Sequence, residues 1–384
     1  MPPIEVTAFL LEELRTHRSE KWREFPSDVL PLPVAEMDFP VAPPIRELLM
    51  EMVSHSDLGY LGPIPEVALA FQGFSKRRWN WTLDPEQVHI VTDVGVGVVE
   101  VLRLFTNPGD RILINTPVYH NFSTWIRETH LEKVDVPFVH DGQGWSLDLQ
   151  AVEEAYRSGV KAHLLCSPHN PIGFVYSRSE LLKIAELARE YSVVVISDEI
   201  HGPLTYSEST FVPFLSLGEA AENVGIVVTA ASKAWNIAGL KCALVVSQSP
   251  RMDALLKQLP IATHYRASLL GGFATAAAFS EGEEWLDGLM KTLDSNRFFL
   301  RELLDKKIPE IKYQVPNCTY LAWLDLEALN LGHNPSQVLL ERGRVALSPG
   351  KAFSPRSLSF VRLNFATSSE ILTEAVNRMA VAIS

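Results

Sequence analysis

The chain has 384 residues and a formal net charge of −12, with 47% hydrophobic and 21% charged residues. This length and composition provide enough apolar material for a large α/β unit with a smaller partner, which excludes a disulfide-stabilised miniprotein and a disordered chain. The acidic balance disfavours nucleic acid and anionic membrane surfaces as partners.

Cysteine usage and the N-terminal region limit the class of protein further. The three cysteines, Cys166, Cys242 and Cys318, are widely spaced and form no C-x-x-C pair, so we expect neither a disulfide framework nor a metal site. The first 25 residues are rich in charge, unlike a secretory signal. The longest nearly apolar stretch, residues 267–279, is shorter than the roughly 20 residues that span a bilayer. We therefore expect a cytoplasmic protein.

A proline-rich segment, residues 31–44, precedes the first clear helical pattern, which begins at Ile45. Proline fixes its own backbone and disfavours helix in the residue before it. We expect this segment to run extended across the surface or over a cleft.

The middle of the chain alternates short apolar, β-branched runs with helical patterns such as residues 96–105 and 179–191. Strands that are apolar on both faces and separated by helices predict a mostly parallel sheet covered by helices on both sides. The expected strands are residues 88–91, 111–114, 131–136, 162–166, 193–197, 225–229 and 242–246.

The pattern changes after residue 280. Residues 283–307 predict one long amphipathic helix, followed by strands at 320–324 and 360–365 around a helix at 335–342. These elements predict a smaller α+β domain. The expected division is a large domain at 46–280 and a small domain formed by 1–45 and 281–384.

Polar clusters follow three of the expected strands. They are S-P-H-N-P-I-G at 167–173, S-D-E-I-H at 197–201 and T-A-A-S-K-A-W-N-I-A-G-L-K at 229–241. Open α/β sheets bind their ligands at the carboxyl ends of parallel strands, so we expect these clusters to meet. A lysine beside a serine is, by itself, more often a solvated surface residue.

With these clusters in place, the chain resembles the fold type I pyridoxal 5′-phosphate enzymes of the aspartate aminotransferase superfamily, class I/II. Asn170, Asp198, Lys233 and Arg362 occur in the order of that family's N-P, D-E, S-K and R-x-N motifs. The resemblance covers essentially the whole chain. It implies the pyridoxal phosphate transferase fold, in which an α/β large domain carries the cofactor beside a smaller domain.

The resemblance also implies a role for each matched residue. Asp198 keeps the cofactor's ring nitrogen protonated, and Asn170 and His201 donate hydrogen bonds to its phenolic oxygen. Lys233 binds the cofactor aldehyde as a Schiff base and then acts as the general base at the substrate Cα. Tyr119 is expected to stack on the cofactor ring, although a core tyrosine is the alternative.

The cofactor phosphate is expected at the start of the helix after the first strand. Gly95, Val96 and Gly97 lie there and would offer backbone N–H groups at a helix N-terminus, with Ser232 and Lys241 completing the site. An ordinary tight turn is the alternative. A dinucleotide fingerprint is less favoured, because G-V-G-V-V-E lacks the third glycine.

Two further residues are placed by the resemblance. Tyr60 aligns with a tyrosine that reaches the phosphate of a neighbouring subunit, so a homodimer with shared active sites is expected. Arg362 lies in an apolar strand, where an unpaired guanidinium is costly and needs an anion. A structural carboxylate is one candidate partner; the resemblance implies the substrate's α-carboxylate.

Within the superfamily, three strings resemble the MalY/PatB-type cystathionine β-lyases, also called C-S lyases: V-A-E-M-D-F at 34–39, S-D-E-I-H, and S-K-A-W-N-I-A-G-L-K. In such an enzyme Ala35 and Glu36 lie near the substrate carboxylate. Trp235, Pro203 and Phe211 depart from the usual pattern, which leaves the substrate pocket undetermined.

The resemblance implies α,β-elimination of L-cystathionine and related cysteine S-conjugates to a thiol, pyruvate and ammonia, with no nucleic acid, membrane or metal involved. An aminotransferase using the same lysine is the alternative. A regulatory protein that binds a partner through its outer surface is a second alternative.

Overall fold

The computed structural model describes residues 4–142 and 144–383, and its largest feature is a seven-stranded sheet in the order β2-β10-β9-β8-β7-β3-β4. Strands β4, β3, β7, β8 and β9 are parallel, while β10 runs antiparallel to both of its neighbours. The prediction of a mostly parallel sheet is confirmed. The strands are β2 (Val88–Val91), β3 (Arg111–Ile114), β4 (Glu132–Asp135), β7 (Ala162–Cys166), β8 (Val194–Asp198), β9 (Gly225–Thr229) and β10 (Ala243–Val246).

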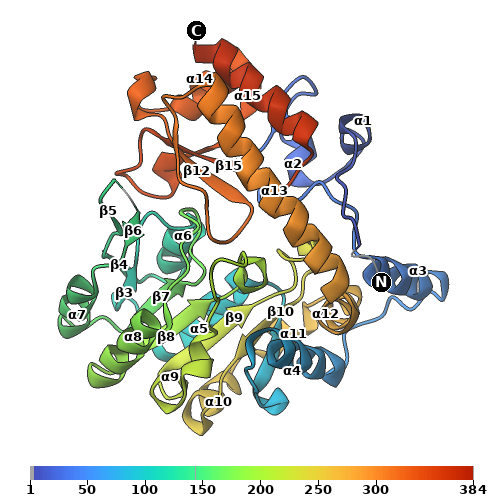
Figure 1. Cartoon of the computed structure of the whole chain (residues 1–384). Helices are drawn as coiled ribbons and strands as arrows, with labels where there is room; N and C mark the ends of the chain where they lie inside the picture. The colour runs from blue at the N-terminus through green and yellow to red at the C-terminus, as the bar shows by residue number, and fades with distance from the viewer. Residues whose placement is uncertain (1–3, 143, 384) are drawn as a thin grey trace.

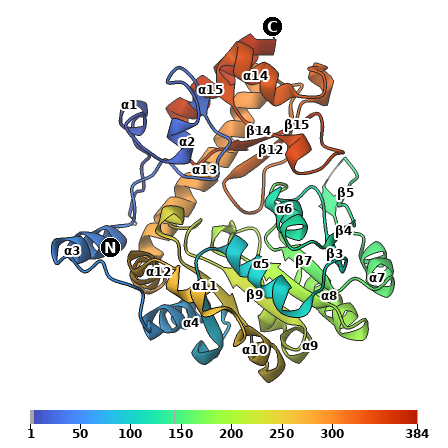
Figure 2. The same cartoon turned by 180° about the vertical axis from the view of Figure 1, so that it is seen from behind.

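Helices cover both faces of this sheet (Figures 1 and 2). Alternate residues of a strand point to opposite faces, so Val227 of β9 belongs to one hydrophobic core and its neighbour Ile226 to the other. The surrounding helices are α3 (Pro43–Ser54), α4 (Pro65–Trp79), α5 (Val94–Phe105), α6 (Asn121–Glu128), α7 (Leu149–Arg157), α8 (Arg178–Glu190), α9 (Glu219–Glu222), α10 (Pro250–Leu256), α11 (Ile261–Tyr265) and α12 (Leu269–Glu281).

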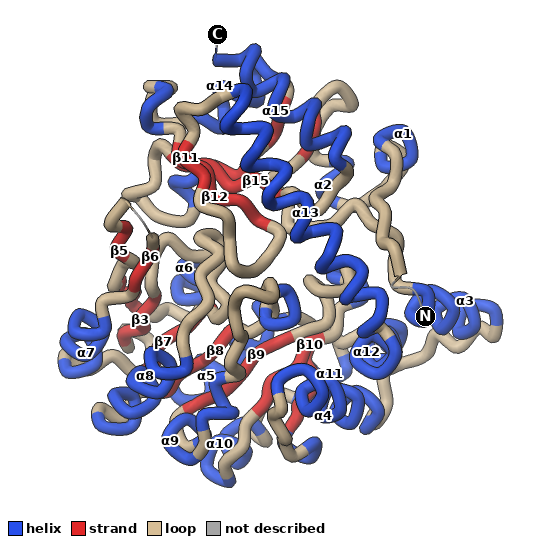
Figure 3. The backbone as a smooth tube through the Cα atoms, in the orientation of Figure 1, coloured by secondary structure: helices blue, strands red, loops and turns tan. Residues whose placement is uncertain are grey.

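A second, antiparallel sheet lies above the first, in the order β11-β12-β15-β14 (Figure 3). The N-terminal segment joins this region, because β1 (Leu30–Pro31) pairs in parallel with β13 (Val345–Ala346). The elements are β11 (Lys312–Tyr313), β12 (Leu321–Asp325), β14 (Ser348–Pro349), β15 (Phe360–Asn364), α13 (Glu283–Lys307), α14 (Pro335–Gly343) and α15 (Ser369–Ile383), with the short α1 (Leu11–Leu14) and α2 (Glu20–Arg23) alongside; a separate hairpin pairs β5 (Val139–His140) with β6 (Trp145–Ser146).

The long helix α13 has the bounds that its apolar period predicts, and it runs from the large sheet to the small one (Figure 1). The exact division at residues 46 and 281 stays a prediction. The apolar stretch at 267–279 lies within α12, a buried helix. In the described part of the chain, no helix is both long enough and apolar enough to span a membrane.

Two helices begin two residues earlier than expected, for local reasons. Helix α5 begins at Val94 because the Asp93 side chain caps it, accepting a hydrogen bond from the Val96 amide at 2.9 Å. Helix α3 begins at Pro43 because proline suits the first helical turn, where its missing N–H costs nothing.

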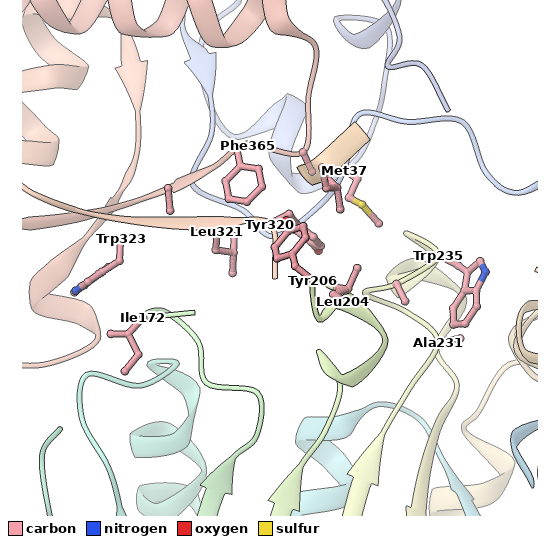
Figure 4. Close-up of a cluster of buried hydrophobic side chains, with 14 of the residues drawn as sticks. Met37, Ile172, Leu204, Tyr206, Ala231, Trp235, Tyr320, Leu321, Trp323 and Phe365 are labelled. Atoms are coloured by element: carbon pink, nitrogen blue, oxygen red, sulfur yellow. The ribbon is translucent and has the colours of Figure 1, made fainter. Parts of the chain in front are cut away.

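A buried apolar cluster joins the two sheets (Figure 4). Tyr320 directly precedes β12 and Phe365 directly follows β15 of the small sheet. Trp235 comes from the loop after β9, and Met37 from residues 33–38, which we call the N-terminal strap. The Tyr320 hydroxyl donates a hydrogen bond to the carbonyl oxygen of Ala35 at 2.9 Å. The strap is therefore fixed between the sheets, and it contains bends at residues 33–35 rather than a continuous strand.

Candidate active site

A cavity of about 670 Å³ lies where the carboxyl ends of the central strands, the N-terminal strap and strand β15 meet. The parallel topology of β7, β8 and β9 places the ends of these strands at one edge, which is why the polar clusters converge. Eleven of the residues that the sequence singles out line this cavity: Ala35, Glu36, Gly95, Tyr119, Asn170, Asp198, His201, Ser232, Lys233, Lys241 and Arg362.

Lys233 lies at the centre of the wall formed by the loop after β9. Its Nζ donates a hydrogen bond to the carbonyl oxygen of Ala35 in the strap, at 2.9 Å. Burial is the main cause that lowers the pKa of Lys233 to about 8, and Arg362 acts in the same direction. An amine with this pKa is partly neutral near neutral pH, as a nucleophile or a general base must be.

Asp198 ends strand β8 and is almost completely buried. Its Oδ1 accepts a hydrogen bond from the Ile200 amide at 3.2 Å, and within the described residues Oδ2 accepts none. Burial raises the pKa of Asp198 to about 7. A carboxylate with so few donors is suited to a cation that enters the cavity from outside the chain.

His201 and Asn170 offer hydrogen-bonding groups on the same side. His201 is 3% exposed, and its Nδ1 forms no hydrogen bond with any described residue. Burial lowers the pKa of His201 to about 3, so the ring is neutral and carries one N–H. Asn170 holds its Oδ1 toward Arg362, at 3.1 Å from Nη1. Both side chains carry N–H donors and line the same cavity as Asp198.

Tyr119 also lines the cavity. Its hydroxyl accepts a hydrogen bond from Asn121 Nδ2 at 2.7 Å, and its ring meets Trp125 edge-on at a centroid distance of 6.0 Å. Burial raises the pKa of Tyr119, so it stays neutral. The alternative of a tyrosine enclosed in the core does not hold, because Tyr119 lines the cavity.

The N-terminus of α5 supplies backbone donors, but at Val94 and Gly95 rather than across residues 95–97. The Val96 amide donates to Asp93 Oδ1 and the Gly97 amide to the Asp93 carbonyl, each at 2.9 Å. Gly97 faces the sheet instead, where a Cβ atom would lie 3.1 Å from Val245. Val96 and Gly97 are therefore not placed with the predicted phosphate-binding residues.

Two more residues predicted to bind the phosphate, Ser232 and Lys241, line the same cavity as Val94 and Gly95. They offer a hydroxyl and an ammonium group. The Nζ of Lys241 lies 3.2 Å from Asp93 Oδ2, in an exposed ion pair. The first-turn amides of α5, a hydroxyl and an ammonium group together form a site suited to a phosphate.

Arg362 projects from β15 and is 4% exposed. Its Nη2 donates to the carbonyl oxygen of Pro33 at 2.8 Å, its guanidinium lies over the Phe353 ring at 4.8 Å, and its Nε forms no hydrogen bond in the described part of the chain. Burial lowers its pKa to about 10. Arg362 forms no ion pair with any Asp or Glu in the described part of the chain. The alternative of a structural carboxylate partner is therefore wrong for the described residues.

Sequence reasoning missed the residues that hold the strap. Asn236 accepts a hydrogen bond from the Met37 amide at 2.9 Å and donates to the Met37 carbonyl at 2.8 Å. Asn364 donates to the carbonyl oxygens of Val34 and Glu36 at 2.8 and 2.6 Å. Their signal was present, since Asn236 lies inside the S-K-A-W-N string and Asn364 follows Arg362 in R-L-N.

Tyr60 lies outside the cavity and is 89% exposed, on the loop before α4. The structure does not bring it to the other predicted residues of its own chain. That position is compatible with the expectation that it serves a neighbouring subunit.

Three features of the cavity fit pyridoxal 5′-phosphate. The buried, donor-poor carboxylate of Asp198 suits a protonated pyridine nitrogen, and the unpartnered Nδ1 of His201 suits the phenolic oxygen beside it. The free amides at the start of α5 suit the phosphate. Lys233 lines the same cavity, and its amine would hold the cofactor through the aldehyde group.

Comparison with known proteins agrees with this geometry. Residues 27–379 match the family model described as aminotransferase class I and II. The chain is 37% identical to the cystathionine beta-lyase of Corynebacterium glutamicum over 96% of this chain and 98% of that protein, and 31% identical to cystathionine beta-lyase PatB of Bacillus subtilis over 93% of each. Cystalysin from Treponema denticola, whose structure contains a pyridoxal 5′-phosphate cofactor, matches with a TM-score of 0.92 and 29% identity, covering 100% of this chain and 99% of that one.

Proposed function

Because this chain belongs to the class I and II aminotransferase family, we propose that it is a pyridoxal 5′-phosphate-dependent carbon–sulfur lyase that cleaves L-cystathionine and related cysteine S-conjugates. The substrate and one water molecule give a thiol, pyruvate and ammonia; cystathionine gives homocysteine as the thiol. The observation that carries the proposal is one cavity holding Lys233, Asp198 and Arg362, in a chain whose full-length relatives are named cystathionine β-lyases.

Bound pyridoxal phosphate supplies an electron sink for the negative charge that develops at the substrate Cα. The residues of this chain bind and orient the cofactor. The negative charge of Asp198 would keep the ring nitrogen protonated. We assign to His201 and Asn170 the role of donating hydrogen bonds to the phenolic oxygen. The phosphate is assigned to Val94, Gly95, Ser232 and Lys241.

Substrate orientation is assigned to Arg362. Its free Nε, together with Nη groups that now bind only neutral oxygens, can bind a carboxylate through two parallel hydrogen bonds. Arg362 and Lys233 line the same cavity, so a substrate whose α-carboxylate is bound by Arg362 would have its Cα proton served by Lys233. Lys233 then removes the Cα proton, and the thiolate leaves from Cβ.

The carbonyl of Ala35 has a part in this proton transfer. It accepts a hydrogen bond from Lys233 at 2.9 Å and thereby fixes where the amine lies once it is free. Since Tyr320 donates to the same oxygen at 2.9 Å, the carbonyl itself is held in place. We assign Ala35 a positioning role and not a chemical one.

Turnover without a keto acid tests the proposal. Purified holoenzyme incubated with L-cystathionine alone should release pyruvate over many turnovers. An aminotransferase would stop after one half-reaction and release no further product until a keto acid is added, and that result would overturn the lyase assignment.

We also propose a homodimer with shared active sites, located in the cytoplasm. Apolar side chains are exposed around Tyr60, namely Leu58 and Tyr265, as is usual for an interface. The three cysteines are unpaired, in keeping with a reducing compartment. Tyr60→Phe should leave a dimer in sedimentation but weaken cofactor retention on dialysis; unchanged retention would remove the role of Tyr60.

A further inference from the structure

The site assigned to the cofactor phosphate contains an anion of the chain itself. Asp93 immediately precedes α5 and lines the active-site cavity together with Val94, Gly95, Ser232 and Lys241. The last four of these residues are assigned to the phosphate, whereas Asp93 carries a negative charge. Two anions in one small site repel each other, so Asp93 affects how tightly the phosphate is held.

Asp93 occupies the positive end of helix α5. Its Oδ1 accepts a hydrogen bond from the Val96 amide, and its backbone carbonyl accepts one from the Gly97 amide, each at 2.9 Å. The unpaired amides of a first helical turn and the helix dipole both favour an anion at this point. In the enzyme without cofactor, the carboxylate of Asp93 is that anion.

Asp93 also binds the cation of the phosphate site. The Nζ of Lys241 lies 3.2 Å from Asp93 Oδ2, and the two side chains are 52% and 40% exposed. The backbone of Lys241 is in the left-handed region, with φ 55° and ψ 67°, and its carbonyl accepts a hydrogen bond from the Ser268 amide at 3.0 Å. The ammonium group therefore extends from a fixed point of the backbone toward the carboxylate of Asp93.

Capping of a helix does not require the charge that Asp93 brings. Helices α8, α10 and α12 are capped by the hydroxyl groups of Ser177, Ser249 and Ser268. Serine and asparagine cap a helix about as well as aspartate does. The charge of Asp93 therefore exceeds what α5 needs, and its effect falls on Lys241 and on an anion bound beside it.

We propose that Asp93 competes with the cofactor phosphate for Lys241 and for the N-terminus of α5, and thereby limits how tightly the enzyme holds pyridoxal 5′-phosphate. Lys241 has to divide its charge between two anions when the phosphate is bound. The cofactor then exchanges more readily, so the occupied fraction of active sites follows the concentration of free cofactor. This inference rests on the assignment of the phosphate under the proposed function.

A comparison of two cofactor forms on the cofactor-free enzyme tests the proposal. 5′-Deoxypyridoxal has a methyl group in place of the phosphate ester and keeps the aldehyde. The Kd of 5′-deoxypyridoxal divided by the Kd of pyridoxal 5′-phosphate, both from titration of visible absorption, measures the contribution of the phosphate. Asp93→Asn keeps a cap and removes the charge, so it should raise this ratio about three- to tenfold. Calorimetry should show inorganic phosphate binding more tightly by a similar factor.

Three further variants locate the effect. Asp93→Ser, a second neutral cap, should raise the ratio as Asp93→Asn does. Asp148→Asn is the matched control, because Asp148 caps α7 outside the cavity and its loss of charge should leave the ratio unchanged. Lys241→Asn, with a residue that tolerates the left-handed region, should lower the ratio about tenfold. Combined with Lys241→Asn, Asp93→Asn should raise the ratio only about twofold.

The possible results separate this inference from the assignment on which it rests. A ratio that stays the same or falls in both Asp93 variants shows that the carboxylate is only a cap and overturns the proposal. A gain that is undiminished in the variant without Lys241 overturns the competition for that residue. If Lys241→Asn leaves the ratio unchanged, the phosphate assignment itself is wrong. A lower ratio in Lys241→Asn without a gain in the Asp93 variants refutes this inference alone.

Discussion

Asp198 and Glu199 are adjacent buried acids that the structure uses in different ways. Asp198 faces the cavity, whereas Glu199 is bonded inside the core, where Ser197 and the Phe214 amide donate to its Oε1 at 3.0 and 2.8 Å. Burial raises the pKa of both carboxyls, to about 7 for Asp198 and to about 8 for Glu199. Comparing variants at the two positions therefore separates the stability lost by burying an acid from the contribution of that acid to turnover.

The cost can be worked out for the enzyme without cofactor. Asp198 has an ordinary pKa of 3.8 when the chain is unfolded and about 7 when it is folded, so between these values the folded state binds more protons. Stability then falls as the pH rises through this window. At about 1.4 kcal/mol per pH unit, burying this acid costs roughly 1.5 kcal/mol at pH 5 and roughly 4 kcal/mol at pH 8.

Replacing Asp198 by Asn removes that cost. We expect Asp198→Asn to raise the free energy of unfolding of the cofactor-free enzyme, with a gain that is larger at pH 8 than at pH 5 by roughly 2–3 kcal/mol. The holoenzyme should behave in the opposite way, because an amide cannot hold the ring nitrogen proton by charge. Its turnover should fall by about two orders of magnitude.

Urea unfolding of the cofactor-free proteins at pH 5 and pH 8, followed by steady-state assays of the holoenzymes, measures both effects. Glu199→Gln is the matched control: it should show a similar pH-dependent gain but keep its turnover, since Glu199 does not line the cavity. A gain for Asp198→Asn that stays the same at both pH values refutes the electrostatic reasoning. Full turnover in that variant refutes the assignment to the ring nitrogen.

Three further expectations concern the cationic residues. Lys233→Ala should abolish both the visible absorption of bound cofactor and turnover, and retention of either would mean that another lysine does the work. Because burial lowers the pKa of Lys233 to about 8, the rate at which cofactor-free enzyme recovers this absorption should rise with pH and level off above about 8; a rise continuing toward 10.5 would contradict the pKa. Arg362→Lys should lower kcat/KM by about 10- to 100-fold through loss of one charge-assisted hydrogen bond, while the exposed Arg356→Lys should have no effect.

The fold and the centre of the site were predictable because they depend on periodic patterns. The spacing of apolar residues gave helix α13 its bounds, and buried β-branched runs gave the seven strands of the large sheet to within about two residues. The parallel direction of β7, β8 and β9 then placed Asn170, Asp198 and Lys233 at one edge. The antiparallel direction of β10 was not predictable, because a buried strand has the same composition in either direction.

The limits of the phosphate site were not predictable for a related reason. G-V-G in the sequence identifies a helix start with room for close approach, but not which amide is free. The cap decides this: Asp93 uses its side chain and its carbonyl to bind the amides of Val96 and Gly97. The free donors therefore move back to Val94 and Gly95.

The contacts that prepare Lys233 for proton transfer could not be predicted from residue types, because they use the backbone. Every residue has a carbonyl, so nothing in the sequence marks the oxygen of Ala35 as the acceptor for an amine 198 positions away. Ordinary polar and charged side chains hold that oxygen in place. Asn236 and Asn364 form hydrogen bonds with the strap directly. The buried ion pair between Lys21 and Asp38 fixes the strap to α2. A buried pair of this kind contributes little net stability but is costly to break on one side. It therefore serves to hold one geometry, in which the carbonyl oxygen of Ala35 accepts the hydrogen bond of Lys233.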